Sequence, residues 1–220
     1  MEDTKPKKSL PKRICIITLI LLGLIFLIYV IINFVFWKKG MPERYFEYTI
    51  LENDTVEIKH YTGSFFLLNI PDTIEGKPVT SIGYHIMWDK DSNALNWFSL
   101  FITSVHLPDT VEETHDYAFS NFTNLRTINI PSNLKRTGIL ILQDTKVTKL
   151  VFPEGITEIG DQAFNRCKAL KKIVIPASVK HIDDHAFSEC TSLEEVIIEG
   201  SPDMGEEVFA GCEKLVNKPE

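Results

Sequence analysis

Apolar residues follow two different patterns along this chain. From Ile14 to Phe36, 23 consecutive positions carry no charged side chain. After about residue 45, apolar residues instead come in short groups that alternate with polar ones, and turn-forming residues separate the groups. A long uncharged apolar run predicts a membrane-spanning helix, whereas alternation predicts strands with one buried face.

The apolar run is long enough to cross a bilayer as one helix. At about 1.5 Å per residue a run of this length reaches roughly 34 Å, against a hydrocarbon core of about 30 Å. A cleavable signal peptide is the competing interpretation, but its apolar region is about 7 to 15 residues long and ends at a small-residue site. No such site follows Phe36. We therefore predict an uncleaved transmembrane helix over residues 14–37 that contacts the lipid bilayer.

Basic residues flank this run unequally, with more before it than after it. The residues before it are Lys5, Lys7, Lys8, Lys12 and Arg13, and those after it are Lys38, Lys39 and Arg44. The positive-inside rule then places the N-terminus in the cytoplasm. The predicted order is a basic cytoplasmic tail (1–13), the helix (14–37), a short linker (38–44) and an ectodomain (45–220) outside the cell membrane.

The second half of the chain repeats with a period of 22 to 23 residues. In three units, beginning at residues 118, 163 and 186, an Ala-Phe pair precedes a Leu-x-x-Ile-x-Ile type of pattern, as in AFNRCKALKKIVIPASV (163–179) and AFSECTSLEEVIIEGSP (186–202). Units stacked at the strand spacing of about 4.8 Å would align their apolar positions into one core, which defines a solenoid. The predicted core residues are Phe119, Leu125, Ile128, Ile130, Leu142, Leu150, Phe152, Phe164, Leu170, Ile173, Ile175, Phe187, Leu193, Val196, Ile198 and Phe209.

The turns of each unit also carry a pattern. Gly83 and Gly160 follow Ile at one turn position, where we expect a positive φ that suits glycine. His115 and Asp183 hold the same slot in other units, and these residue types tolerate that conformation better than most. The Ala-Phe pair predicts a short helical or 3₁₀ turn opposite the strand.

These spacings resemble those of the BspA-like leucine-rich-repeat family. Residues 45–63 look like the strand-turn-strand cap of that family, and residues 64–215 look like about five to six coils. The resemblance implies an α/β leucine-rich-repeat solenoid, strand-rich and preceded here by one transmembrane α-helix. It also implies a bacterial surface protein with a role in adhesion or ligand binding, without naming a ligand.

Two segments depart from the repeat. Residues 88–101 contain an insertion with Trp88, Trp97, Phe98 and Phe101. We favour a local hydrophobic plug over a recognition loop, because aromatic side chains bury much area. Residues 132–142 lack the usual Ile-Gly and Ala-Phe pairs, which predicts an irregular coil.

The sequence offers little catalytic chemistry. A net charge of −7 argues against nucleic-acid binding, and nucleophile-elbow, zinc-protease and phosphate-loop motifs are missing. We therefore predict no enzyme activity, no cofactor and no metal; His181 and His185 lie in a turn, where their spacing does not place them on one face. Cys15 lies in the apolar run. Cys167, Cys190 and Cys212 share one column, which favours buried reduced thiols over a disulfide between neighbours.

In each strand, the residues between the buried positions point to the outer face of the sheet. A curved sheet face is the usual binding surface of a solenoid, although β-branched residues there can also be mere strand formers. The candidate binding face consists of Lys149, Val151, Lys172, Val174, Glu195 and Ile197.

The predicted function is therefore a membrane-anchored extracytoplasmic module that binds a protein or surface ligand. The first alternative is a structural or assembly partner of another membrane protein that uses the apolar helix. A membrane-tethered enzyme is the second, and it would need a pocket that the sequence does not assemble.

Overall fold

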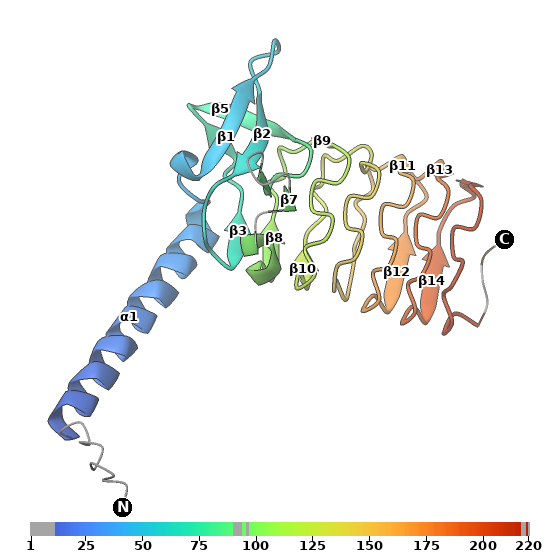
Figure 1. Ribbon diagram of the computed structural model, residues 1–220. Helices are drawn as coiled ribbons and strands as arrows, with labels where there is room; N and C mark the ends of the chain where they lie inside the picture. Colours follow the sequence, from blue (N-terminus) through green and yellow to red (C-terminus); the bar gives the residue numbers. More distant parts are fainter. Residues whose placement is uncertain (1–11, 90–93, 96, 217–218, 220) are drawn as a thin grey trace, which may run out of the picture.

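The computed structural model describes residues 12–89, 94–95, 97–216 and 219 and shows a long helix followed by a solenoid (Figure 1). Helix α1 (Lys12–Lys39) extends away from one end of the solenoid, and the C-terminus lies at the other end. The tail residues 1–11 lie outside the described part of the chain. Gly40 takes a positive φ directly after α1, and Met41 is buried at the start of the solenoid.

A β-hairpin begins the solenoid. The 3₁₀ helix η1 (Glu43–Tyr45) leads into β1 (Phe46–Ile50), which pairs antiparallel with β2 (Val56–Tyr61) around a bulge between Glu47 and Tyr48. Strand β2 also pairs in parallel with β5 (Lys77–Ile82), and β4 (Thr73–Ile74) folds back antiparallel on β5. Both edges of β2 are therefore paired, so the hairpin covers the end of one ladder.

Each coil contributes a short parallel strand to one or both of two ladders (Figure 1). One ladder contains β5, β9 (Glu113–Thr114), a bridge at Arg136, β11 (Glu158–Ile159), β13 (His181–Ile182) and β15 (Asp203–Met204). The other, which we call the ladder face, contains β3 (Leu67–Asn69), β8 (Ser104–His106), β10 (Thr127–Ile128), β12 (Lys172–Ile175) and β14 (Glu195–Ile198). The 22 to 23-residue period predicts one strand per coil in each ladder, and the ladder face departs from this between β10 and β12, where Lys149 forms only an isolated bridge.

The core lies between the two ladders and is built around a column of phenylalanines. Phe164 stacks on Phe187 with ring centroids 5.1 Å apart, and Phe187 stacks on Phe209 at 5.6 Å. Of the residues predicted as core, most are buried and four are only half-buried against the core. These four are Ile128, Ile130, Val196 and Ile198.

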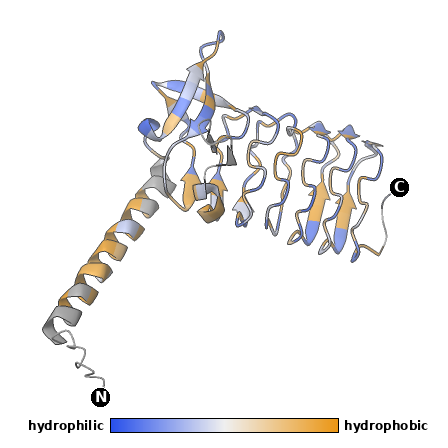
Figure 2. Cartoon of the chain, viewed as in Figure 1, coloured by the Kyte–Doolittle hydropathy of each residue, from blue (hydrophilic) through white to orange (hydrophobic). Residues whose placement is uncertain are grey.

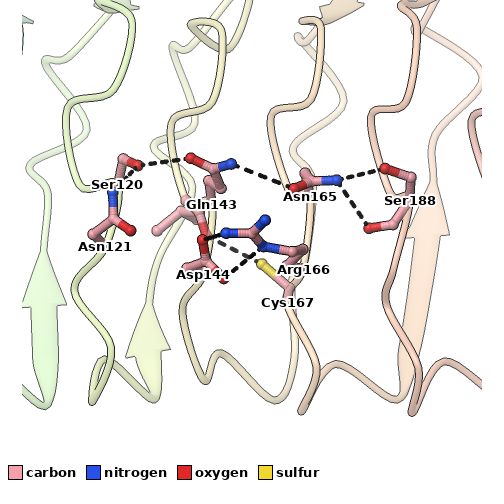
Figure 3. A network of polar contacts seen from close by, with 9 residues as sticks. Ser120, Asn121, Gln143, Asp144, Asn165, Arg166, Cys167 and Ser188 are labelled. Atoms are coloured by element: carbon pink, nitrogen blue, oxygen red, sulfur yellow. Dashed lines mark hydrogen bonds and ion pairs between the residues drawn. The ribbon is translucent and has the colours of Figure 1, made fainter. Parts of the chain in front are cut away.

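A row of polar side chains runs along the stack from coil to coil (Figure 3), each one position after the large core residue of its turn. Ser120 donates to Gln143 Oε1 at 3.3 Å, and Gln143 Nε2 donates to Asn165 Oδ1 at 3.4 Å. Asn165 Nδ2 then donates to Ser188 Oγ at 2.5 Å. Because partly buried polar groups cost free energy unless they are paired, this row favours one register between neighbouring coils.

The Ala-Phe segments are single turns closed by an i→i−3 hydrogen bond of the 3₁₀ type, as from Ser120 N to Tyr117 O at 3.0 Å, and they do not extend into a helix. In each turn, backbone N–H groups donate to the next coil, as when Phe119 N donates to Ile141 O at 3.0 Å and Phe164 N to Ala186 O at 2.8 Å. Each turn has one or two residues with positive φ, which interrupt any helix. These form one column of His85, Tyr117, Leu140, Gln162, His185 and Glu207, and a second of Asn121, Asp144, Arg166, Glu189 and Gly211.

The repeats therefore form a β-solenoid rather than the predicted α/β arrangement. In the described part of residues 40–216, the helical segments are the 3₁₀ helices η1 and η2 (Trp97–Phe101). In an α/β repeat, helices satisfy the backbone N–H and C=O groups of these segments. Here, hydrogen bonds between the turns of neighbouring coils satisfy them instead.

The expectation of a positive φ at Gly83 and Gly160 was also wrong, since neither glycine is among the residues with positive φ. The reason for glycine is close approach instead. A Cβ on Gly83 would lie 2.8 Å from Ile58 O, and one on Gly160 would lie 2.8 Å from Thr137 O. Gly138 occupies the same slot in the segment 132–142, where a Cβ would meet the His115 carbonyl more closely still.

Replacing Gly138 with alanine should therefore destabilise the solenoid by about 1–3 kcal/mol, the usual cost of overpacking a tight site. Gly155→Ala is the matched control, because the nearest atom to its Cβ would lie at an ordinary 3.4 Å. Thermal unfolding followed by circular dichroism measures both. Equal melting temperatures for the two variants would contradict the close-approach explanation.

Helix α1 presents apolar side chains to its surroundings (Figure 2). Side chains are described for Ile17, for residues 19–32, and for Phe34 and Val35, and large apolar ones among them are mostly exposed. Within the described residues, no helix combines the length and hydropathy needed to cross a membrane.

Candidate protein-binding face

The first coils of the ladder face satisfy their polar side chains among themselves. Thr127 Oγ1 donates to Ser104 Oγ at 2.6 Å. Asn129 reaches across to the neighbouring coil, where its Oδ1 accepts from Leu107 N at 2.8 Å and its Nδ2 donates to Leu107 O at 2.7 Å. These contacts fix the polar side chains of β8 and β10 in place.

The later coils carry the predicted apolar column. Val151 is 61% exposed and Ile197 is 38% exposed, while Val174 between them is half-buried. In the register of the ladder, Val174 pairs with Ile197. The column therefore forms a strip of exposed apolar surface over three coils.

Charged residues border this strip. Lys172 pairs with Glu195 across β12 and β14, with Nζ and Oε1 2.8 Å apart. Lys149 is exposed and pairs through its backbone with Lys172. The structure thus places all six predicted residues on one face, where they combine an apolar strip with a polar border.

A groove adjoins the strip at Val151, and the sequence did not predict it. The groove has a volume of about 460 Å³. It forms where the ladder is interrupted, since β10 pairs with β8 on one side, whereas Lys149 forms a bridge with β12 on the other. Its lining residues are Asp109, Arg126, Thr127, Ile128, Asn129, Ile130, Ser132, Thr148, Lys149, Val151 and Pro153.

The groove combines an apolar floor with two cations and one anion. Ile128 and Ile130, which the sequence assigns to the core, are half-buried and line the groove. Hydrogen bonds from Ser132, whose backbone N–H lies 3.0 Å from Asp109 Oδ1, hold the pKa of Asp109 below its usual value. Arg126 and Lys149 are exposed at the same groove. An apolar surface with a few placed charges is typical of a site for a protein segment.

One sequence signal points to the groove in retrospect. The irregular coil over residues 132–142 sits between β10 and the segment that carries Lys149. Arg136 there makes isolated bridges to Glu113 and Glu158 on the opposite ladder. The coil that lacks the usual Ile-Gly and Ala-Phe pairs therefore continues the ladder that contains β9 and β11 but interrupts the ladder face.

The three cysteines of the repeats, Cys167, Cys190 and Cys212, are buried thiols that form no disulfide with one another. Each donates to a carbonyl of the preceding coil at 3.2 Å, as Cys190 does to Phe164 O and Cys212 to Phe187 O. Burial raises the pKa of Cys167 to about 12, and a hydrogen bond with Cys212 together with burial raises the pKa of Cys190. The thiols of Cys167 and Cys190 therefore stay protonated and unreactive at neutral pH. The side chain of Cys15 lies outside the described residues.

His181 and His185 each face an acidic residue of the next coil. His181 Nδ1 lies 3.3 Å from Asp203 Oδ2, and His185 Nδ1 lies 3.6 Å from Glu207 Oε2. The two histidines thus have separate partners. In the described parts of the chain, no group of three or more His, Cys, Asp or Glu side chains is arranged to hold a metal ion.

The insertion over residues 88–101 is only partly a plug. Strand β6 (Trp88–Asp89) pairs with β7 (Ala94–Leu95), and η2 follows. Phe98 packs against the core, but Trp97 and Phe101 are exposed. The favoured interpretation therefore holds for Phe98 and fails for Trp97 and Phe101.

Together, the paired ladders, the phenylalanine column and the exposed strip define a repeat protein with an extended lateral surface. The BspA type leucine-rich-repeat region model matches residues 91–216 in six copies. Since this match covers more than half of the chain, the protein belongs to the BspA-type leucine-rich-repeat family. No curated protein matches the sequence significantly.

Solved structures support the same fold. A leucine-rich-repeat protein of T. pallidum superposes with a TM-score of 0.64 at 22% identity, covering 80% of this chain and 91% of the other. A leucine-rich cell surface protein from Faecalibacterium prausnitzii superposes with a TM-score of 0.50 at 23% identity, covering 80% of this chain and 52% of the other. At these identities the likeness establishes the solenoid fold alone.

Proposed function

We propose that this protein is a binding module that holds a protein partner on its ladder face. The observation that carries the proposal is the exposed strip of Val151, Val174 and Ile197, continuous with the groove at Val151. Exposed apolar strips with polar borders are typical of protein interaction sites. A solenoid face suits this role because it is extended and its coils are held in fixed register.

The groove indicates the chemistry of the partner. Arg126 and Lys149 lie over an apolar floor that includes Ile128, in a chain whose net charge is −7. A partner segment could place an apolar side chain on Ile128 and Val151. A carboxylate next to that side chain could then pair with Arg126 or Lys149. A local basic site on an acidic protein also favours an acidic segment over a basic one.

The proposal includes a membrane anchor at residues 14–37. It is supported by the 23 uncharged residues of the apolar run, by the excess of basic residues before it, and by the exposed apolar side chains of α1. In this arrangement the repeats lie outside the cytoplasm, with the N-terminus inside. Large apolar side chains such as Leu22 and Phe26 are 62% and 67% exposed, and a bilayer would cover them.

An assembly role in the membrane is the second candidate, favoured by the same exposed helix. Exchange of residues 14–36 for an unrelated apolar span separates the two. Loss of function with unchanged partner binding by the repeats would favour assembly, whereas full function would favour the binding module.

Catalysis is a weaker candidate because the described pockets do not combine a nucleophile with a positioned base. The hollow around Asp161, His181 and Asp183 is mainly acidic. Burial and the nearby carboxylates raise the pKa of Asp183. Turnover of any substrate by the purified full-length chain would overturn this view.

The binding proposal is tested by changing Val151, Val174 and Ile197 together to threonine, which keeps strand propensity. We expect partner affinity to fall by about tenfold or more, since losing only ~1.4 kcal/mol of binding free energy weakens affinity tenfold. Binding of the full-length chain in detergent micelles is measured by calorimetry with the partner that the wild type captures. Ile139→Thr is the control, because Ile139 is similarly exposed at 39% but lies in a turn. Wild-type affinity of the folded triple variant would contradict this site.

A further inference from the structure

The N-terminal end of the solenoid carries an exposed aromatic patch, which we define as Phe66, Trp97, Leu100 and Phe101. Their side chains are 42%, 62%, 46% and 43% exposed. Phe66 precedes β3, and the other three lie in η2, so two neighbouring coils supply the patch. Solvent-exposed aromatic clusters of this kind mark interaction surfaces.

The aromatic patch is continuous with helix α1. The rings of Tyr29 and Phe66 are 5.6 Å apart, those of Phe66 and Phe101 are 6.0 Å apart, and those of Phe101 and Trp97 are 5.4 Å apart. Helix α1 meets the solenoid at its first coils (Figure 1). An apolar groove of about 580 Å³ lies at this junction. It is lined by Phe26, Tyr29, Val30 and Phe34 of α1 and by Phe66, Leu67, Thr103 and Ser104 of the solenoid.

The solenoid holds the aromatic patch in place. Asn124 Nδ2 of the next coil donates to Leu100 O at 2.8 Å, and Thr103 N donates to Phe66 O at 2.9 Å. Phe98, next to Trp97, packs against the core. These contacts hold the backbone of η2 and the residue before β3 in place, so Trp97 and Phe101 are exposed on a well-anchored part of the surface.

The two chain segments that carry the aromatic patch contain no formally charged residue; the charge nearby is Lys146 of a later coil, whose Nζ donates to Asn124 Oδ1 at 3.0 Å beside Leu100. Residues 60–71 and 92–105 contain no Asp, Glu, Lys or Arg. A protein partner is normally held with a charged or polar rim, whereas the boundary between lipid headgroups and acyl chains accepts Trp and Phe without counter-charges. The composition of the patch thus favours a lipid surface over a protein.

The position of the aromatic patch along α1 agrees with a lipid surface. Tyr29, which contacts Phe66, comes seven residues before Phe36, the end of the apolar run. At ~1.5 Å per residue this is about 10 Å below the outer end of the run. Side chains at the membrane interface are buried by about 5–10 Å. The helix and the patch would therefore meet the outer leaflet together.

We infer that the aromatic patch inserts into the outer leaflet beside α1 and seats the first coils of the solenoid on the bilayer. The inference rests on the proposed membrane anchor. It assigns η2 a second membrane contact, which would restrict how the solenoid turns relative to the helix. The strip of Val151, Val174 and Ile197 lies on later coils and stays separate from this contact.

Lipid-dependent quenching of single tryptophans tests the inference. The full-length chain is reconstituted in phosphatidylethanolamine and phosphatidylglycerol vesicles that contain lipids brominated near the acyl-chain top. One variant keeps only Trp97, with Trp37→Phe and Trp88→Phe; a second keeps only Trp37, with Trp88→Phe and Trp97→Phe. The control replaces all three native tryptophans with Phe and adds Ile139→Trp on an exposed turn. Circular dichroism checks that each variant is folded.

We expect Trp97 to be quenched several-fold more than the tryptophan at position 139, and Trp37 to be quenched as well. Quenching of Trp37 with Trp97 no higher than the control would overturn the inference and leave the anchor in place. If neither Trp97 nor Trp37 is quenched, both the inferred membrane contact of the patch and the proposed membrane anchor are wrong. If Trp97 is shielded only as protein density in the vesicles rises, irrespective of brominated lipid, the patch contacts protein and the inference is wrong.

Discussion

Replacing Phe164 with alanine is expected to destabilise the solenoid by about 3–5 kcal/mol, the range for a buried phenylalanine truncated in a core. Phe164 is fully buried, stacks on Phe187 at 5.1 Å, and meets Phe152 edge-on at 5.5 Å. Its backbone N–H also donates to the next coil, so the ring and the turn belong to the same contact between coils. In a solenoid such nearest-neighbour contacts carry much of the stability.

Denaturant unfolding of the full-length chain, followed by circular dichroism, measures this loss. Val151→Ala is the matched control, because Val151 is 61% exposed and its truncation should change stability by only about 0.5 kcal/mol. A cost below about 1 kcal/mol for Phe164→Ala would mean that the neighbouring coils do not depend on the phenylalanine column.

The second large effect concerns the apolar helix. Deleting residues 14–36 is expected to move the protein from the membrane fraction to the soluble fraction, since about 20 apolar residues suffice to hold a span in a bilayer. Removing residues 2–11 instead is the matched control and should leave the protein in the membrane. Alkaline carbonate extraction followed by immunoblotting measures the distribution of each variant.

Topology is read in the same cells. Protease added outside should remove a C-terminal tag and spare an N-terminal one, because the basic excess lies before the helix. Retention of the deletion variant in the membrane, or loss of the N-terminal tag alone, would contradict the proposed anchor.

Local repetition made the core predictable from sequence. Phe164 and Phe187 are 23 residues apart, and one coil per period necessarily places them next to each other. The column of Cys167, Cys190 and Cys212 follows by the same logic. The repeat period is therefore enough to predict which equivalent residues of neighbouring coils lie next to each other.

Properties that depend on the distance between particular coils were not predictable. Gly83 and Gly160 are required by the carbonyls of a preceding coil, which the sequence does not locate, so a positive φ was the wrong explanation. The groove at Val151 arises because pairing lapses between β10 and the next coil. That lapse moves Ile128 from the expected core to the groove floor.

The exposed aromatic residues illustrate a third limit. Residues 88–101 contain an insertion relative to the 22 to 23-residue period, so no column assigns Trp97 or Phe98 to the core or to the surface. The structure separates these neighbours, because η2 turns Phe98 toward the core and leaves Trp97 exposed. An insertion of this kind keeps the solenoid in register while adding surface of its own.

The central claim, that a protein partner is held on the ladder face, is tested most directly by site-specific photo-crosslinking in cells that naturally produce the protein. A photoreactive phenylalanine analogue replaces Val151 in the full-length chain, and the same analogue at Ile139 is the control. Irradiation should give a discrete adduct of higher mass from position 151, weakened when Val174 and Ile197 are changed to threonine, and none from position 139. The absence of any adduct at 151, or the same adduct from both positions, would contradict the claim.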